Sequence, residues 1–214
     1  MNLYQYFLDN PGFGMYKWEH YFPIYERHFD CWRNKSVTVI EIGVFKGGSL
    51  ELWSKYFGPH ARVIGIDINP DCVKYDKNNP YVRIGDQQDT NFLNSIIGEF
   101  GTPDIIIDDG SHKMSDVVNT FNFLYPQLSK NGVYLIEDVH TSYWPEFDGG
   151  LHYETTINRS KNHIDELNAY HSRGLINPTI VTNITNSITY YDSVIVYERG
   201  LSLTKKSTFT GSND

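Results

Sequence analysis

The sequence predicts an α/β protein, a doubly wound, Rossmann-like sheet of seven mostly parallel strands that ends in an antiparallel hairpin. Short apolar runs alternate with helical patterns along most of the 214 residues, which is typical of parallel strands joined by crossover helices. A glycine-containing turn follows the first of these runs, at 43–48. The last apolar stretch, 187–198, breaks at Asp192 and Ser193, and a hairpin there makes one edge strand antiparallel.

The order of the elements follows from periodicity and turn residues. Six strands are expected near 37–42, 62–67, 81–84, 104–108, 133–137 and 193–198, and a seventh at either 179–183 or 187–191. Helices are expected near 48–57, 70–77, 89–99 and 115–129. The last helix is the clearest, because Ser115 is positioned to cap it and its apolar residues fall on one face.

We expect one main domain over 36–200, preceded by a helical segment at 1–35 that covers the cofactor. Residues 140–178 show no clean period and carry several Gly and Pro residues. Such a long excursion indicates a functional lid that binds the acceptor. The polar segment 201–214 is expected to be a disordered tail.

Composition excludes several classes of protein. A formal net charge of −8 argues against a nucleic-acid partner, which would need clustered Lys and Arg. The N-terminus shows no leader pattern, and no apolar run approaches the ~20 residues of a membrane span. Cys31 and Cys72 lie far apart, so we expect free thiols and a cytoplasmic protein.

The turn after the first strand identifies a class of ligand. In an α/β sheet such a turn binds ligands at the helix N-terminus. The glycines of Gly43-Val-Phe-Lys-Gly-Gly-Ser49 do not match the G-x-G-x-x-G spacing of dinucleotide sites. Glu41, just before the turn, would repel a pyrophosphate but suits a sulfonium. The sequence therefore favours S-adenosylmethionine, and the terminal hairpin matches the sheet of class I methyltransferases.

Successive strands end in acidic residues, and the carboxyl ends of parallel strands share one edge of a sheet. Asp67 stands 24 residues after Gly43, where a carboxylate would accept hydrogen bonds from ribose hydroxyls. Asp86 and Gln87 are then placed near the adenine amino group. A single such Asp has a plain alternative, since Asp favours strand ends for backbone reasons.

A second group of residues indicates a metal and a base. Asp109, Glu137 and Asp138 follow two adjacent strands, and three gathered carboxylates require a cation or protons. Oxygen ligands favour Mg²⁺ or Mn²⁺. His112 lies three residues after Asp109 and could remove a proton from a metal-bound hydroxyl. The alternative is that His112 caps the next helix and that the acids only face solvent.

Together these residues resemble the metal-dependent sugar O-methyltransferases of the macrocin and mycinamicin type, a family shared with so-called cephalosporin hydroxylases. The matching segments are His20–Glu26, Glu41–Leu50, Ile64–Ile68, Ile107–His112, Glu137–Trp144 and Tyr191–Glu198. The resemblance implies that Asp109, Glu137 and Asp138 hold Mg²⁺ and that His112 is the base. It also places Lys17, His20 and Tyr21 near the cofactor.

The full set of expected cofactor residues is Lys17, Tyr21, Glu41, Gly43, Gly47, Ser49, Asp67, Asp86, Gln87 and Asp108. His140, Tyr143 and Trp144 are expected at the acceptor, with other aromatic residues of 140–178. The expected acceptor is a sugar hydroxyl of a glycan, a nucleotide sugar or a glycosylated metabolite. Only about 35 residues precede the first strand, without the large extra domain of the macrolide enzymes, so the acceptor and a homo-oligomeric state stay open.

Three alternatives remain. The first is an O-methyltransferase that acts on a non-sugar hydroxyl. The second is a hydroxylase, although the His-rich ligand set that iron would require is missing. The third is a non-catalytic S-adenosylmethionine-binding relative, which would not need Asp109, Glu137 and His112 together.

Overall fold

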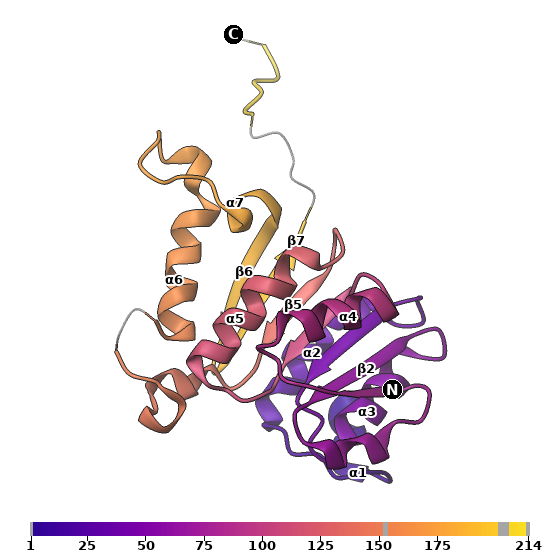
Figure 1. Cartoon of the computed structure of the whole chain (residues 1–214). Coiled ribbons are helices and arrows are strands. Elements are labelled where there is room, and N and C mark those ends of the chain that lie inside the picture. The colour runs from indigo at the N-terminus through magenta and orange to yellow at the C-terminus, as the bar shows by residue number, and fades with distance from the viewer. Residues whose placement is uncertain (1, 152–153, 201–205, 213–214) are drawn as a thin grey trace.

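The structure is a computed structural model that describes residues 2–151, 154–200 and 206–212. Its centre is a seven-stranded sheet in the order β3-β2-β1-β4-β5-β7-β6, shown in Figure 1. The strands are β1 (Thr38–Ile42), β2 (Arg62–Asp67), β3 (Tyr81–Ile84), β4 (Ile105–Asp108), β5 (Val133–Ile136), β6 (Thr185–Tyr191) and β7 (Val194–Arg199). The first five are parallel, and β7 is antiparallel to both β5 and β6. This confirms the predicted fold class, terminal hairpin included.

Helices cover both faces of the sheet. They are α1 (Leu3–Asp9), α2 (Phe22–Phe29), α3 (Gly48–Phe57), α4 (Thr90–Phe100), α5 (Met114–Leu124), α6 (Thr156–Leu167) and α7 (Ile180–Ile184). One buried cluster joins α1, α2 and α3 to one face through residues such as Val39, Trp53 and Ile107. A second joins α4 and α5 to the other face around Ile40, Ile106 and Phe121. Alternate residues of β1 and β4 thus enter different cores, as strand geometry requires.

Some predicted elements differ from the structure. The helix expected at 115–129 begins at Met114 with Lys113 at its N-cap, so Ser115 is not the cap. It ends at Leu124, and a 3₁₀ turn with Pro126 follows, because proline cannot continue a helix with its backbone nitrogen. The segment expected at 70–77 is a 3₁₀ turn over Pro70–Tyr75. Of the two candidates for the seventh strand, 179–183 is largely helical and β6 contains 187–191.

The excursion at 140–178 contains a helix that the sequence analysis missed. The 12 residues of α6 are mostly polar, and Thr155 caps them by accepting from the Asn158 amide. Ile157, Ser160 and His163 are too few and too mixed to give a clear apolar period. Figure 1 shows α6 standing beside α5, with α7 next to its far end. Of the expected tail, 201–205 and 213–214 lie outside the described residues, and 206–212 are exposed and irregular.

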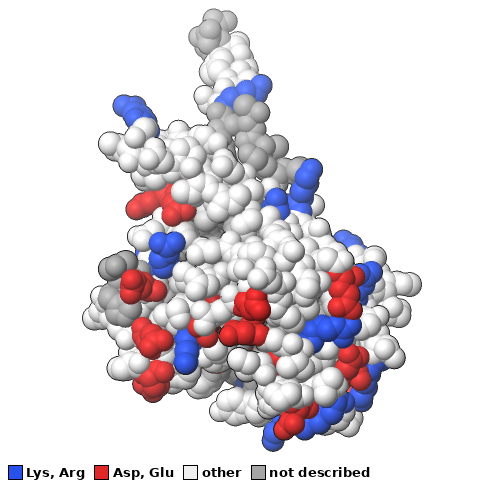
Figure 2. Space-filling model, in the orientation of Figure 1, with Lys and Arg blue, Asp and Glu red and all other residues white. Residues whose placement is uncertain are grey.

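None of the helices in the described ranges is long and apolar enough to cross a membrane. Figure 2 shows Lys and Arg side chains interspersed with Asp and Glu over the visible face. This face therefore presents charges of both signs rather than one broad basic area.

Candidate active site

Glycine is required in the turn after β1 because the chain packs closely there. Gly43 has φ +96° and Gly47 has φ +77°. A Cβ on Gly43 would lie 2.1 Å from the Asp109 carbonyl oxygen, and one on Gly47 would lie 2.7 Å from the Tyr75 ring. The turn can therefore pack against the end of β4 only if position 43 has no side chain. This contact brings the first strand end to the acidic residues of the fourth.

Two cavities meet at Gly43. The larger, of about 340 Å³, lies at the carboxyl ends of the parallel strands and is lined by Gly43, Asp67, Asp86 and Gln87, among others. The smaller, of about 20 Å³, is lined by Lys17, Gly43, Ser49 and Asp109, with Tyr16 and Phe45. Most of the expected cofactor residues thus line a continuous edge of the sheet, where open α/β sheets bind ligands.

The polar groups at the larger cavity also hold its loops. Asp67 Oδ2 accepts from the amides of Val44, at 2.8 Å, and Phe45, at 3.1 Å. Gln87 Oε1 accepts from the Ser111 amide at 2.9 Å, while its Nε2 donates to Thr120 Oγ1 at 3.0 Å. Asp67 therefore steadies the glycine turn, and Gln87 ties the loop after β4 to α5.

Glu41, Asp108 and Gly47 line neither cavity. Glu41 is fully buried and accepts from Ser49 Oγ at 2.6 Å and Trp53 Nε1 at 3.0 Å. Asp108 accepts from the Tyr134 hydroxyl at 3.0 Å. Burial raises the pKa of Asp108 to about 7, since an ionised carboxylate loses its hydration there. Glu41 and Asp108 thus lie beneath the cavities and hold neighbouring side chains in place through hydrogen bonds.

The N-terminal segment supplies partners for the carboxylates after β5. The Tyr21 hydroxyl donates to Asp138 Oδ1 at 2.6 Å, and the Tyr25 hydroxyl donates to Glu137 Oε1 at 2.8 Å. Lys17 Nζ lies 2.5 Å from Asp109 Oδ2 and 2.9 Å from Glu137 Oε2. Lys17 and Tyr21 thus reach the acidic cluster, and Lys17 also lines the smaller cavity. Tyr25 was not among the expected site residues, because nothing in the sequence links it to the strand end after β5.

Burial and pairing set the charges of this cluster. Burial lowers the pKa of Lys17, but attraction to three carboxylates has a larger effect in the opposite direction. The pKa of Lys17 is therefore held well above its usual value by Asp109, Glu137 and Glu41. Burial, and then repulsion by Asp109, raise the pKa of Glu137. Burial also raises the pKa of Glu41. One ammonium is therefore shared by several carboxylates, and the cluster holds more acidic groups than fixed cations.

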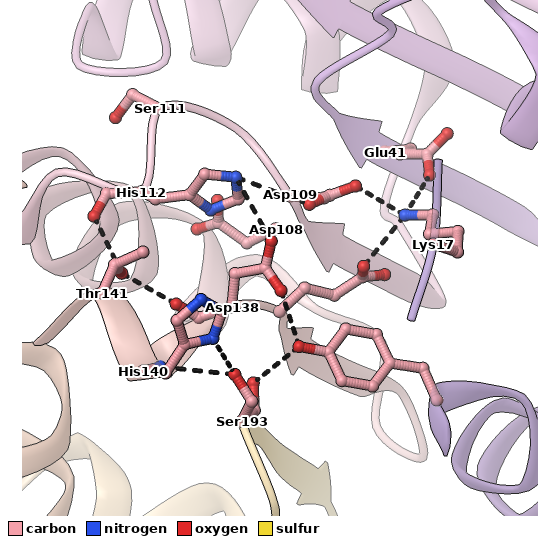
Figure 3. Close-up of polar contacts among 12 residues, drawn as sticks. Lys17, Glu41, Asp108, Asp109, Ser111, His112, Asp138, His140, Thr141 and Ser193 are labelled. Atoms are coloured by element: carbon pink, nitrogen blue, oxygen red, sulfur yellow. Dashed lines mark hydrogen bonds and ion pairs between the residues drawn. The ribbon is translucent and has the colours of Figure 1, made fainter. Parts of the chain in front are cut away.

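Asp109, His112 and Asp138 face one another at the exposed side of this cluster. Their ligand atoms all lie within 4.8 Å of one another. His112 Nε2 is 3.7 Å from Asp109 Oδ1 and 3.8 Å from Asp138 Oδ2. Figure 3 shows the His112 imidazole pointing toward both Asp109 and Asp138. In the chain, Asp109 and His112 follow β4 and Asp138 follows β5. The two partly exposed carboxylates fit a divalent cation that keeps some water ligands, with the His112 imidazole beside them.

Glu137 lies apart from this group of three. Its two carboxylate oxygens contact Tyr25 and Lys17, on the inner side of Asp109.

His112 and Asp138 both have left-handed backbones, with φ of 58° and 53°. Such conformations are uncommon outside glycine and concentrate at functional sites.

Aromatic rings border the cluster on the solvent side. The His140 ring contacts Trp18 and Trp144, with centroids 6.1 and 4.7 Å apart, and its Nδ1 contacts Ser193 Oγ. The centroids of the Phe147 and His112 rings lie 6.2 Å apart. Tyr143 and Trp144 are about half exposed, as is Trp18. Trp18 was not among the expected acceptor residues, because nothing in the sequence links the N-terminal segment to the loop after β5.

Among the other aromatic residues of 140–178, Tyr170 lies away from the site, and His152 and Tyr153 fall outside the described residues. The Tyr170 hydroxyl donates to Asn183 in α7 at 2.8 Å, so Tyr170 belongs to the far end of α6. The part of the expected lid that borders the site is the stretch of 3₁₀ turns over Val139–Tyr143 and Pro145–Phe147.

Known proteins with similar sequences include several sugar O-methyltransferases. The chain is 41% identical over 146 residues to mycinamicin VI 2''-O-methyltransferase of Micromonospora griseorubida. It is 39% identical over 151 residues to an 8-demethyl-8-α-L-rhamnosyl tetracenomycin-C 2'-O-methyltransferase of Streptomyces olivaceus. These alignments cover 65% and 66% of this chain but 36% and 39% of the relatives. The chain thus spans well under half the length of these relatives. No protein-family model matches it.

Solved structures agree with the sequence relatives. The mycinamycin-pathway methyltransferase MycE, in complex with Mg, S-adenosylhomocysteine (SAH) and mycinamycin VI, superposes with a TM-score of 0.85 at 32% identity. The match covers all of this chain and 57% of that one. A second crystal form with Mg and SAH gives 0.86 at 31% identity. By sequence and by fold, the chain is a homologue of the sugar O-methyltransferases of the macrocin and mycinamicin type.

Proposed function

We propose that this protein is an S-adenosylmethionine-dependent O-methyltransferase that requires a divalent cation and methylates a sugar hydroxyl. One observation carries the proposal. The two cavities at the glycine turn share Gly43, and the smaller is also lined by Asp109, a member of the carboxylate–imidazole cluster of Asp109, His112 and Asp138. The solved homologue holds Mg, SAH and a glycosylated macrolide. A methyl donor and a metal-bound acceptor would need such adjoining sites.

S-adenosylmethionine would occupy the two cavities. We assign its ribose to Asp67 and its adenine to the end near Asp86 and Gln87, which line the larger cavity. The methionine part would extend past Gly43 toward Ser49 and Lys17 in the smaller cavity. Gly47 would serve by letting the turn form, and Glu41, Asp108 and Tyr21 by fixing the groups around it. The methyl group would then face the carboxylate cluster.

We assign the cation, Mg²⁺ or Mn²⁺, to Asp109 and Asp138, with Glu137 as a third ligand on the basis of the resemblance. When bound, the cation would lower the pKa of an acceptor hydroxyl and fix which oxygen reacts. His112 Nε2 then takes the hydroxyl proton, a role typically worth about 10²–10⁴ in rate. Tyr21 keeps Asp138 in place through its hydrogen bond. The protein otherwise aligns two reactants, since the sulfonium is already activated.

The acceptor would be a sugar of a glycan, a nucleotide sugar or a glycosylated metabolite. The rings of Trp18, His140 and Trp144 border the proposed base and cation site. Aromatic faces stack on the apolar side of a sugar ring, and polar ring edges bond hydroxyls. Tyr143 lies in the same 3₁₀ turn as His140 and is half exposed. The segment at 140–178 would contribute through this turn, while α6 anchors it.

We also propose that the enzyme works in the cytoplasm. Both cysteines, exposed Cys31 and buried Cys72, are free. An exposed free thiol suits a reducing compartment. The expected homo-oligomer stays a prediction, which light scattering of the purified chain would test.

Calorimetry of ligand binding tests the cofactor and the cation separately. We expect SAH to bind with EDTA present, because its cavity does not need the cation, and NAD not to bind. Mn²⁺ should bind the wild type, and Asp138→Asn should weaken that binding at least tenfold while SAH affinity stays within about twofold. Binding of NAD in place of SAH would contradict the cofactor assignment. Undiminished Mn²⁺ binding by Asp138→Asn would contradict the cation assignment.

A further inference from the structure

Lys17 places an ammonium group inside the acidic cluster. Its side chain is only 3% exposed, and its Nζ lies within 4 Å of three carboxylates. The distances are 2.5 Å to Asp109 Oδ2, 2.9 Å to Glu137 Oε2 and 3.6 Å to Glu41 Oε1. Figure 3 shows Lys17 between Glu41 and Asp109. No other lysine or arginine forms an ion pair with these three carboxylates in the described part of the chain.

The inner oxygens of this cluster are satisfied by protein groups alone. Glu137 uses one oxygen for Lys17 and the other for the Tyr25 hydroxyl. Glu41 accepts from Ser49 and Trp53 in addition to its ion pair. Asp109 turns Oδ2 toward Lys17 and Oδ1 toward His112. The cluster is therefore paired on its inner side, where buried charges need partners, and open toward His112 and Asp138.

Lys17 and a divalent cation would need the same oxygens. The proposed function assigns Asp109 and Glu137 to the cation, yet each already gives an oxygen to the ammonium. Like charges at such short range repel strongly where water is excluded. The two cations would therefore share or contest these carboxylates, and each would lower the affinity of the site for the other.

We propose that Lys17 is a resident counter-ion, which holds Asp109 and Glu137 together before a divalent cation binds and competes with that cation for the same carboxylates. This inference rests on the cation site of the proposed function. It makes Lys17 a positioning residue whose charge weakens cation binding, so that the cation can be exchanged.

Mn²⁺ binding by Lys17→Met provides the test, with Lys130→Met as the control. Methionine keeps much of the apolar stem but removes the charge, while Lys130 is exposed. Titration calorimetry should show Mn²⁺ binding at least tenfold tighter in Lys17→Met than in the wild type. In EDTA, Lys17→Met should melt at a lower temperature than Lys130→Met. Saturating Mn²⁺ should restore much of that difference, because a second cation then neutralises the carboxylates.

Several results would overturn the inference. Equal Mn²⁺ affinity in the wild type and Lys17→Met would show that Lys17 does not compete. Weaker Mn²⁺ binding by Lys17→Met would show that Lys17 only orients the ligands. Either result leaves the cation site itself intact. If neither protein binds Mn²⁺, the cation site of the proposed function fails, and the competition fails with it.

A second variant covers the case in which Lys17→Met does not fold even with Mn²⁺. Lys17→Met/Glu137→Gln removes one charge of each sign, and the glutamine oxygen can still accept from the Tyr25 hydroxyl. If Lys17 acts as a counter-ion, the double variant should fold in EDTA and melt cooperatively. Failure of the double variant, with Glu137→Gln alone folding normally, would show that Lys17 has a packing role instead.

Discussion

At the scale of residues, backbone strain marks the proposed site. Phe45, His112 and Asp138 all have positive φ, between 52° and 58°. A non-glycine residue in a sparsely populated conformation costs of order 1–3 kcal/mol, and such residues persist where the surroundings enforce them. Phe45 lies within the glycine turn, and its amide donates a hydrogen bond to Asp67. The strained backbones of His112 and Asp138 bring an imidazole and a carboxylate to the same point.

His112→Ala tests the proposed base. We expect kcat to fall by about 10²–10⁴, because Nε2 no longer takes the proton of the acceptor hydroxyl. SAH affinity should stay nearly unchanged, since His112 lines neither cofactor cavity. Initial rates and SAH calorimetry measure the two effects. The control is His60→Ala, at an exposed histidine outside the site. Loss of SAH binding by His112→Ala would instead indicate a structural role.

Much of this site could be predicted from residue types at the strand ends. The protein groups that pair with the carboxylates could not. Acidic residues after parallel strands must share one edge of the sheet, so Asp109 and Asp138 were expected together. Which protein groups meet them depends on contacts such as Lys17 with Glu137, 120 residues apart in the chain. No local pattern records such a contact. For the same reason the sequence could not predict that Glu41, which is expected at the cofactor, is buried and accepts a hydrogen bond from Trp53 Nε1.

At the scale of elements, the strands could be predicted from sequence and α6 could not. Four of the parallel strands, β1, β2, β4 and β5, are short apolar runs largely buried on both faces, and that signal is readable without tertiary context. The 12 residues of α6 are mostly polar, and the helix depends on packing against α5 and β7. His163 supplies that contact, stacking on Phe121 with centroids 5.4 Å apart and meeting the Tyr197 hydroxyl at 2.9 Å. Because the buried face of α6 carries a histidine where an aliphatic residue would be expected, the sequence shows no apolar period for this helix.

Burial of His163 predicts that acid weakens the attachment of α6. Burial lowers the pKa of His163, so below about pH 6.5 the unfolded chain binds a proton that the folded chain excludes. Stability should therefore fall as pH drops through that value, by at most about 1.4 kcal/mol per pH unit from this group. His163→Gln should lose this part of the dependence, because glutamine does not titrate.

Urea unfolding at several pH values between 5 and 8 measures this effect. We expect the wild type and the exposed-site control His60→Gln to lose more stability on acidification than His163→Gln does. Parallel curves for all three proteins would show that His163 does not contribute to the pH dependence.

At the scale of the whole molecule, the fold brings distant segments to one edge of the sheet. The N-terminal segment supplies Lys17, Trp18 and Tyr21, the parallel strands supply the acidic residues, and the loop after β5 supplies His140 and Trp144. The terminal hairpin completes the arrangement, since Ser193 at its turn contacts His140. The parallel strands and the terminal hairpin were predictable from the strand pattern, and the resemblance placed Lys17, His20 and Tyr21 near the cofactor, but no sequence pattern indicated which carboxylates the N-terminal segment meets.

Transfer of a labelled methyl group tests the central claim most directly. The protein would be incubated with methyl-labelled S-adenosylmethionine and a panel of nucleotide sugars and glycosides, with Mg²⁺ or with EDTA. We predict that the label moves to a sugar oxygen in Mg²⁺, that EDTA abolishes the transfer, and that excess Mg²⁺ restores it. Undiminished transfer in EDTA, or label on an acceptor that carries no sugar, would contradict the account.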